Sequence, residues 1–266
     1  MSVLHRRITS GVVYGLLTLS VVYLGGLPFC AAVLAMVILA GREYQRMLAV
    51  GGFRPFYALQ YGLTAFLLLG VVFLPPEAIL GGFTLILVSS FAWQLTRTAE
   101  AEEPFVDWAL SLAGALYVGW LASHFILLRK LPGGLGWVLL AVLATWLCDS
   151  FAYIFGRVWG KHPFFPRISP KKTWEGTLGG WVGGTGTSLV MGGALGLSIL
   201  ESLTLGLAIS LAATFGDLAE SMVKRQVGVK DSGSLIPGHG GILDRMDSLL
   251  FVVAVVYYLV VWVLGG

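Results

Sequence analysis

Two aspartates stand inside otherwise apolar runs, Asp149 in ATWLCDSFAY and Asp217 in AATFGDLAES. A charge inside an apolar helix is costly and needs a partner, and a salt bridge to a neighbouring helix is enough to explain a single buried aspartate. Asp217, Ser221 and Lys224 are spaced by four and three residues, so they share one helix face. Two such carboxylates close to basic loops favour an ion site over two isolated salt bridges.

A polar loop follows the second aspartate and reads KRQVGVKDSGSLIPGHGGILDRMD. Its glycines and proline interrupt regular structure around Lys230, Asp231 and His239. Asp244 and Asp247 then stand three residues apart at the start of the last apolar run, where carboxylates suit a helix N-terminus. Capping alone accounts for Asp247, and it is a weaker account of Asp244, which follows a run of basic residues.

A second polar loop, GRVWGKHPFFPRISPKKTWEG, contributes Arg157, Lys161, Arg167, Lys171 and Lys172. Ordinary retention of positive loops, or attraction to anionic lipid at about 1 kcal/mol per basic residue, explains the charge. Neither explains two basic loops that flank buried carboxylates. Oxygen ligands for Mg²⁺ together with cations for phosphate oxygens are what phosphoryl or nucleotidyl transfer requires.

Signatures of other mechanisms are missing from the sequence. It contains no Gly-x-x-x-x-Gly-Lys-Ser/Thr phosphate loop, no His-Glu-x-x-His zinc helix and no Gly-x-Ser-x-Gly nucleophile elbow. The two cysteines lie in separate apolar runs and support neither a disulfide framework nor a metal cluster. Of the four histidines, only His239 is embedded among the charged residues.

The elements that position these residues are membrane helices, because 57% of the chain is hydrophobic and 12% is charged, against roughly 25% charged in soluble domains. Long apolar runs, without the alternation of a β-barrel, predict an all-α polytopic membrane protein. Gly179, Gly180, Gly183 and Gly184 are interpreted as packing spacers between helices. The first run is longer than the apolar part of a usual signal peptide, so we expect it to be a retained span. About nine spans are predicted, near residues 8–25, 27–46, 56–74, 77–96, 107–128, 134–156, 174–195, 199–224 and 247–264.

Orientation follows from the basic residues, because short positively charged loops stay cytoplasmic. With the N-terminus inside and the C-terminus outside, every Lys and Arg except Arg129 and Lys130 falls on the cytoplasmic side. Charge also divides the chain along its length. Residues 1–148 are predicted to be scaffold helices, and residues 149–266 a catalytic half with two basic cytoplasmic loops, within one integral membrane unit.

The charged stretch from Ser221 to Asp247 resembles a known family pattern. Its residue types and their spacing resemble the pattern of the phosphatidate cytidylyltransferases at Ser221, Lys224, Arg225, Lys230, Asp231, Pro237, His239, Gly240, Gly241, Asp244, Arg245 and Asp247. The segments CDSFAYIFGR and SPKKTWEG are similar to family motifs as well. The family more often has Thr-Asp or Ala-Asp at the first of them, so Cys148 is a mild departure.

The resemblance implies transfer of CMP from CTP to phosphatidic acid, giving CDP-diacylglycerol and pyrophosphate. It also implies Mg²⁺ with K⁺ as a second ion, a homodimer, and a bacterial cytoplasmic (inner) membrane with the site facing the cytoplasm. Asp217 and Asp244 are the expected metal ligands, with Asp149 as a third candidate. The expected catalytic residues are Asp217, Asp244, Lys224, Arg225 and His239. The expected substrate-binding residues are Ser169, Lys171, Lys172, Thr173, Ser221, Lys230, Asp231 and Arg245.

His239 is interpreted as a hydrogen-bond donor to a phosphate, because the attacking lipid phosphate is already anionic near neutral pH and needs no strong base.

Three other functions compete with the cytidylyltransferase interpretation of the whole chain. An ion-coupled transporter also uses intramembrane aspartates, but no inverted pair of broken helices is evident and the charge crowds into one half. A CTP-dependent polyprenol kinase is the nearer alternative. Transfer from a CDP-lipid to an alcohol calls for an Asp-Gly-x-x-Ala-Arg motif, which the sequence lacks.

Overall fold

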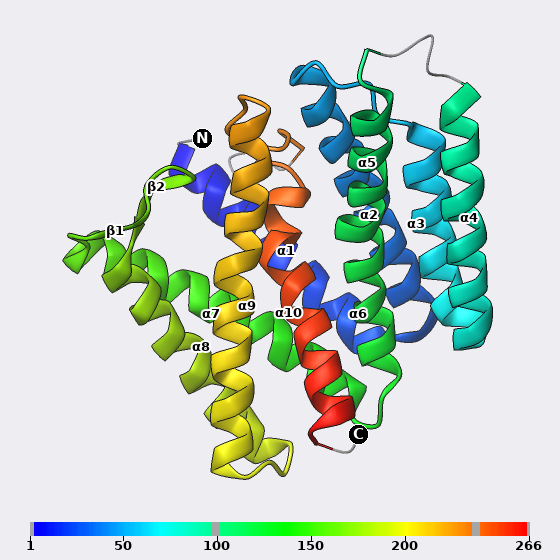
Figure 1. Cartoon of the computed structure of the whole chain (residues 1–266). Coiled ribbons are helices and arrows are strands. Elements are labelled where there is room, and N and C mark those ends of the chain that lie inside the picture. The colour runs from blue at the N-terminus through cyan, green and yellow to red at the C-terminus, as the bar shows by residue number, and fades with distance from the viewer. Residues whose placement is uncertain (1–2, 97–101, 236–239, 265–266) are drawn as a thin grey trace.

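The computed structural model describes residues 3–96, 102–235 and 240–264, with the side chains of the first helix described from Thr9 onward. Within these residues the chain is a bundle of long helices with one small sheet (Figure 1). The helices of the first half are α1 (Val3–Leu24), α2 (Gly26–Val50), α3 (Tyr57–Phe73), α4 (Pro76–Thr96), α5 (Pro104–Gly114), the π-helical turn η2 (Ala115–Trp120) and α6 (Leu121–Lys130). Those of the second half are α7 (Gly134–Trp159), α8 (Trp174–Ala194), α9 (Ile199–Gln226) and α10 (Leu243–Trp262).

Each predicted span coincides with a helical segment, so the polytopic helical fold is confirmed. Among the described residues, six segments are long and apolar enough to cross a membrane: α2, α4, the continuous α5–η2–α6, α7, α9 and α10. The apolar parts of α1 and α3 are shorter, and the glycine-rich α8 is not among these six. Nine as the number of membrane crossings therefore stays a prediction.

The all-α expectation needs one correction, in the loop before α8. That loop contains an antiparallel hairpin of β1 (Pro163–Phe165) and β2 (Ser169–Thr173). The hairpin is held to the start of α8, since the Trp174 backbone N–H donates to the His162 carbonyl at 2.9 Å. The rings of Phe164 and Trp174 also pack edge to face, with centroids 4.4 Å apart. Strands this short carry no periodic pattern that a sequence could reveal.

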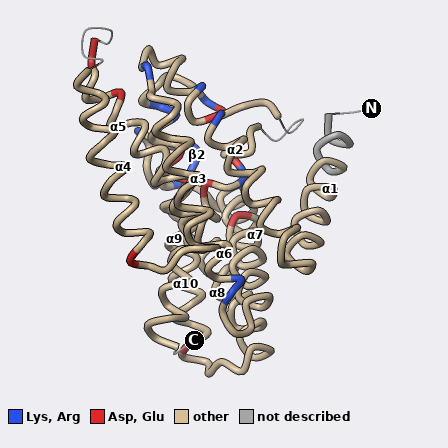
Figure 2. The backbone as a smooth tube through the Cα atoms, turned by 90° about the vertical axis from the view of Figure 1, so that its right-hand side faces the viewer, with Lys and Arg blue, Asp and Glu red and all other residues tan. Residues whose placement is uncertain are grey.

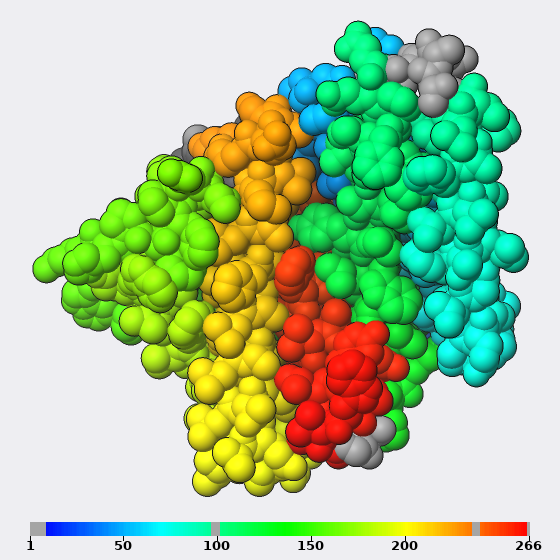
Figure 3. All heavy atoms as spheres, in the orientation of Figure 1, coloured from blue at the N-terminus to red at the C-terminus, as the bar shows by residue number. Residues whose placement is uncertain are grey.

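The glycines of α8 act as packing spacers, as predicted. A Cβ atom at Gly176 would lie 2.8 Å from the Ala152 carbonyl oxygen of α7, and one at Gly180 would lie 2.9 Å from the Cys148 carbonyl oxygen. Gly179 and Gly183 meet Phe rings of α7 in the same way. The backbones of α7 and α8 therefore approach closely, as small residues allow between membrane helices, and the pair projects with the hairpin to one side of the molecule (Figures 1 and 3).

Helix α9 joins this pair to the rest of the bundle, because α8 and α10 both pack against it. The N- and C-termini lie at opposite ends of the bundle, and most Lys and Arg residues gather toward the end that carries the N-terminus and the hairpin (Figure 2). Arg129 and Lys130 lie apart from this group, and the Lys130 ammonium donates to the Val71 carbonyl at 2.8 Å. Most basic side chains are thereby concentrated at one end of an otherwise apolar helix bundle.

Candidate active site

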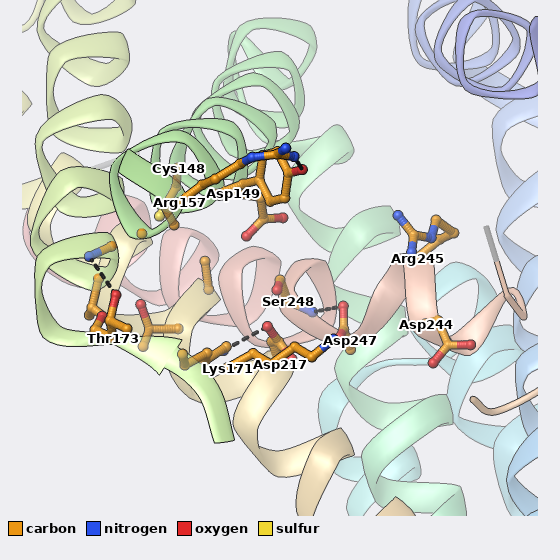
Figure 4. A pocket seen from close by; sticks show the side chains of 18 of the residues that line it. Cys148, Asp149, Arg157, Lys171, Thr173, Asp217, Asp244, Arg245, Asp247 and Ser248 are labelled. Atoms are coloured by element: carbon orange, nitrogen blue, oxygen red, sulfur yellow. Dashed lines mark hydrogen bonds and ion pairs between the residues drawn. The ribbon is translucent and has the colours of Figure 1, made fainter. Parts of the chain in front are cut away.

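A cavity of about 630 Å³ lies among α7, β2, α8, α9 and α10 (Figure 4). Its size is typical of small-molecule sites. The charged residues that line it are Asp149, Asp217, Asp231, Asp244, Asp247, Arg157, Lys171, Lys172, Lys224 and Arg245. Five carboxylates facing five basic groups suit the joint binding of a cation and phosphate oxygens, whereas a purely basic cavity would suit phosphate alone.

Asp217 is an accessible carboxylate of the cavity. One oxygen lies 2.6 Å from the Lys172 ammonium, and the two side chains are 34% and 24% exposed. The other oxygen accepts a hydrogen bond of 3.3 Å from the hydroxyl of Ser221, one helical turn further along α9. Asp217 and Ser221 therefore share one face of α9, as predicted, and the Asp217–Lys172 ion pair is partly open to solvent.

Asp149 of α7 and Asp247 of α10 face the same cavity as Asp217 (Figure 4). Gly216 brings α9 and α10 together, because a Cβ atom there would lie 2.6 Å from the Asp247 carbonyl oxygen. One oxygen of Asp247 accepts the Ser248 backbone N–H at 2.7 Å. Three carboxylates from three helices thus gather around one space, an arrangement that a bound cation stabilises.

Asp244 differs from these three because its oxygens are already engaged. Oδ1 lies 2.7 Å from the Lys224 ammonium. Oδ2 accepts three hydrogen bonds: from the Ser232 backbone N–H at 3.0 Å, from the Ser232 hydroxyl at 2.9 Å and from the Gly241 backbone N–H at 2.8 Å. Gly240, with a φ of +83°, turns the chain so that Gly241 reaches the carboxylate. Asp244 therefore holds the polar loop against α10.

Lys224 is the centre of this buried ion cluster. Besides Asp244, it pairs with Glu220 at 2.5 Å, and the Glu220 side chain is fully buried. Because Lys224 lies between two carboxylates, it is less free to bind a substrate phosphate than Lys172 is. The expected catalytic role of Lys224 and the expected metal role of Asp244 stay predictions.

Arg225 links the two basic loops to each other. Its Nε donates to the Ile168 carbonyl between the strands at 3.1 Å, and Nη1 donates to the Val229 carbonyl at 3.2 Å. Both loops therefore lie at the same end of the bundle, as the sequence predicts. Arg225 is not among the described residues that line the cavity.

The remaining candidates divide into two groups. Lys171, Thr173, Asp231 and Arg245 line the cavity. Thr173 also caps α8, since its hydroxyl oxygen accepts the Gly176 N–H at 3.2 Å. The described candidates that do not line the cavity are Ser169, Ser221 and Lys230. His239 lies outside the described residues.

Two residues that line the cavity, Asp247 and Arg157, are not among the site residues predicted from the sequence. Asp247 was explained by helix capping, yet it lies within α10 and faces the cavity, one turn after Asp244. The three-residue spacing of this pair was the available signal. Arg157, counted only as loop charge, lines the cavity next to Tyr153, whose hydroxyl accepts its Nη1 at 2.8 Å. No pattern in the sequence singled it out from the other basic residues.

The carboxylates of the cavity fit one common mode of Mg²⁺ binding, in which the protein supplies only a few of the ligands. Within the described residues, no three His, Cys, Asp or Glu side chains form a ready-made metal cage. Mg²⁺, however, is usually held by one or two carboxylates together with waters and substrate phosphates. Asp217, with Asp149 and Asp247 beside it, offers carboxylate oxygens of this type.

Membrane helices that present carboxylates and basic groups in one cavity define a membrane-embedded candidate for phosphate-group chemistry. Residues 5–263 match the model of the cytidylyltransferase family. The chain belongs to this family, whose members are nucleotidyltransferases.

Curated relatives align over nearly the whole length of the chain. It is 36% identical to the phosphatidate cytidylyltransferase of Synechocystis sp., with 97% of each chain covered. It is 35% identical to the protein of that name from Staphylococcus epidermidis, and the alignment covers 96% of this chain and 98% of the relative. It is also 35% identical to the one from Bacillus subtilis, with 96% of this chain and 97% of the relative covered. These names favour the cytidylyltransferase over the polyprenol kinase and the transporter.

Proposed function

We propose that this protein transfers the CMP group of CTP to phosphatidic acid, giving CDP-diacylglycerol and pyrophosphate. The observation that carries the proposal is the open Asp217–Lys172 pair in the charged cavity. It supplies a carboxylate for a metal ion and a cation for a phosphate, side by side, and Lys172 belongs to the SPKKTWEG segment that is similar to a family motif. The family membership and the names of the relatives support the same reaction.

The chemistry needs no covalent enzyme intermediate. An anionic oxygen of the lipid phosphate attacks the α-phosphorus of CTP and forms the new P–O bond. The bond between the α-phosphorus and the oxygen that bridges to the β-phosphorus breaks, and its electron pair leaves with pyrophosphate. Because the nucleophile is already charged, the main barrier that the protein must lower is repulsion between two polyanions.

The basic side chains lower that repulsion. When phosphate oxygens enter, Lys172 leaves Asp217 for the phosphate, which frees a carboxylate oxygen at the moment when the substrate arrives. Lys171, Arg157 and Arg245 surround the same space and supply further positive charge. Lys224 stays with Glu220 and Asp244 and keeps α9 and α10 in register.

Mg²⁺ bound at Asp217, together with Asp149 and Asp247, would supply Lewis-acid stabilisation of the phosphate charge. K⁺ is proposed as the second ion on the family resemblance. His239 is proposed to donate a hydrogen bond to a phosphate.

The cavity is proposed to open toward the cytoplasm of a bacterial inner membrane. Both basic loops lie at its end of the bundle, and positively charged loops stay inside. A cysteine at the exposed loop residue Ser234 should then react only with an impermeant thiol reagent that is given access to the cytoplasmic face. Reaction from the outer face of intact cells would reverse the orientation.

The family resemblance also supports a homodimer. The mass of the detergent-solubilised protein, measured by light scattering with the detergent subtracted, should equal two chains. A single-chain mass in active protein would remove the dimer from the proposal.

A direct assay tests the reaction. Detergent-purified protein receives phosphatidic acid, Mg²⁺ and CTP labelled either in the cytosine ring or in the γ-phosphate. The ring label should move into lipid and the γ label into pyrophosphate. Movement of the γ label into lipid would instead identify a kinase, and no movement of either label would reject both activities.

A further inference from the structure

Glu43 lies on α2, in the half of the chain predicted to be scaffold, yet its carboxylate contacts the polar loop of the other half. One oxygen, Oε2, accepts the backbone N–H of Leu243 at 2.8 Å and the hydroxyl of Ser232 at 3.1 Å. These partners are 200 and 189 residues away in sequence. The side chain is buried, and a buried carboxylate is tolerated only where such donors surround it.

The loop is shaped to enclose this carboxylate. A Cβ atom at Gly233 would lie 2.5 Å from Glu43 Oε1, and one at Gly241 would overlap both Glu43 Oε2 and the Ser232 hydroxyl. Glycine at both positions therefore lets the backbone come close to Glu43 from two directions. The carboxylate thus contacts two segments of the polar loop, residues 232–233 and residues 241–243.

Glu43 is linked to the ion cluster through Ser232. The Ser232 hydroxyl lies between two carboxylates, 3.1 Å from Glu43 Oε2 and 2.9 Å from Asp244 Oδ2. Asp244 in turn holds Lys224. Leu243, whose N–H binds Glu43, is the first residue of α10, the helix that carries Asp247 into the cavity. A chain of contacts therefore runs from the scaffold half to Lys224 and to the start of the helix that carries Asp247.

We infer that Glu43 is a positioning residue: it sets the start of α10 and the conformation of the polar loop, and through them the placement of Asp247 and Arg245 in the cavity. The inference rests on the proposed function, since it assigns Glu43 to the same reaction. Glu43 does not line the cavity and is not expected to touch substrate.

The test compares Glu43→Ala with Glu43→Gln. Glutamine retains an oxygen that can accept the Leu243 N–H and the Ser232 hydroxyl. Alanine leaves the Leu243 N–H unpaired and leaves the Ser232 hydroxyl with Asp244 alone. We expect kcat to fall about 10- to 100-fold in Glu43→Ala, the effect of misplacing reacting groups by about 1 Å. KM for CTP should change less, and Glu43→Gln should stay within about threefold of the wild type.

A matched control separates positioning from general stability. Gln60 of α3 is also buried, and its amide donates to the Gly41 carbonyl of α2 at 3.2 Å, whereas Glu43 binds the polar loop. Gln60→Ala should lower thermal stability but leave kcat per folded molecule near wild type. Amide hydrogen exchange in a peptide covering residues 227–243 should accelerate in Glu43→Ala and stay unchanged in Gln60→Ala.

Two results would overturn the inference while leaving the proposed function intact. One is wild-type kcat in folded Glu43→Ala, and the other is loop exchange in that variant no faster than in Gln60→Ala. A wild-type protein that makes no CDP-lipid would instead reject the proposed function. The exchange measurement would still report on the contact itself, because it does not depend on activity.

Discussion

The charged end of the bundle contains two regions that use the same residue types differently. In the open region, Asp217 pairs with Lys172, and both side chains are about a quarter to a third exposed. In the closed region, Lys224 lies between Glu220 and Asp244, and these side chains are 10%, 0% and 9% exposed. The open pair can exchange partners with an incoming ligand, whereas the closed cluster cannot do so without uncovering a buried charge.

This difference predicts a binding role for the open pair and a positioning role for the closed cluster. Lys224 and Asp244 belong to the family pattern, whereas Asp217 stands one helical turn before its first residue, Ser221. The contacts of Lys224 and Asp244 hold α9, α10 and the polar loop together. Substitutions in the open region should therefore affect chemistry and leave folding intact. Substitutions in the closed region should affect both.

The largest effect is expected for Asp217→Asn. Loss of a charged metal ligand should lower kcat by about 10³-fold or more, because metal stabilisation of the transition state is worth several kcal/mol. Thermal stability should be unchanged or slightly higher, because repulsion toward Asp149 and Asp247 is relieved. Glu201→Gln, which removes the same charge at the far end of α9, is the control and should remain active. Near wild-type turnover of Asp217→Asn at saturating Mg²⁺ would remove this residue from the metal site.

Asp244→Asn is expected to reduce both stability and turnover. Its amide group can no longer neutralise Lys224, and breaking a buried pair costs about 3 to 5 kcal/mol. The midpoint of thermal unfolding should fall by about 5 to 10 °C, and kcat of the remaining folded protein by about 10- to 100-fold. An unchanged midpoint would show that Asp244 does not hold the closed region together.

A smaller effect is expected for Lys172→Met, which removes a phosphate contact of the open region. KM for CTP should rise about tenfold, the equivalent of one ionic contact of about 1.4 kcal/mol, with a lesser change in kcat. Lys172→Arg retains the charge and should recover most of the affinity. If both variants bind CTP as the wild type does, Lys172 serves only as the partner of Asp217.

His239→Gln should have the smallest effect. Glutamine can replace a hydrogen-bond donor, so kcat should stay within a few-fold of wild type and the main change should be a higher KM. A general base would behave differently, with kcat falling by about 10² to 10⁴ and the acidic limb of the pH profile lost. Steady-state kinetics across pH distinguish the two roles.

Much of the fold could be predicted because membrane helices depend on local composition. Apolar runs located the helical segments, and the glycines of α8 predicted close packing against another helix, which the structure identifies as α7. The hairpin at 163–173 was missed because strands of 3 and 5 residues carry no repeating pattern. The contact between Phe164 and Trp174 becomes visible only in the folded chain. The π-helical turn at 115–120 left no signal in an unbroken apolar run.

The site was predictable where its residues are unusual for their surroundings. Asp149 and Asp217 stood out as carboxylates in apolar helices, and the structure places both at one cavity. Glu43 could not be found in this way, because its partners are about 200 residues away and only the packed fold brings them together. Nor could the sequence distinguish the open Lys172 from the closed Lys224, since that difference depends on burial.

Metal binding by folded variants tests the division into open and closed regions most directly. Binding of Mn²⁺, as a paramagnetic substitute for Mg²⁺, can be measured by electron paramagnetic resonance in the presence of CTP. We predict that Asp217→Asn weakens Mn²⁺ binding at least about tenfold, because an anionic oxygen ligand is lost, while folded Asp244→Asn stays within a few-fold of wild type. Wild-type binding by Asp217→Asn together with lost binding by Asp244→Asn would contradict the account and place the metal in the closed region.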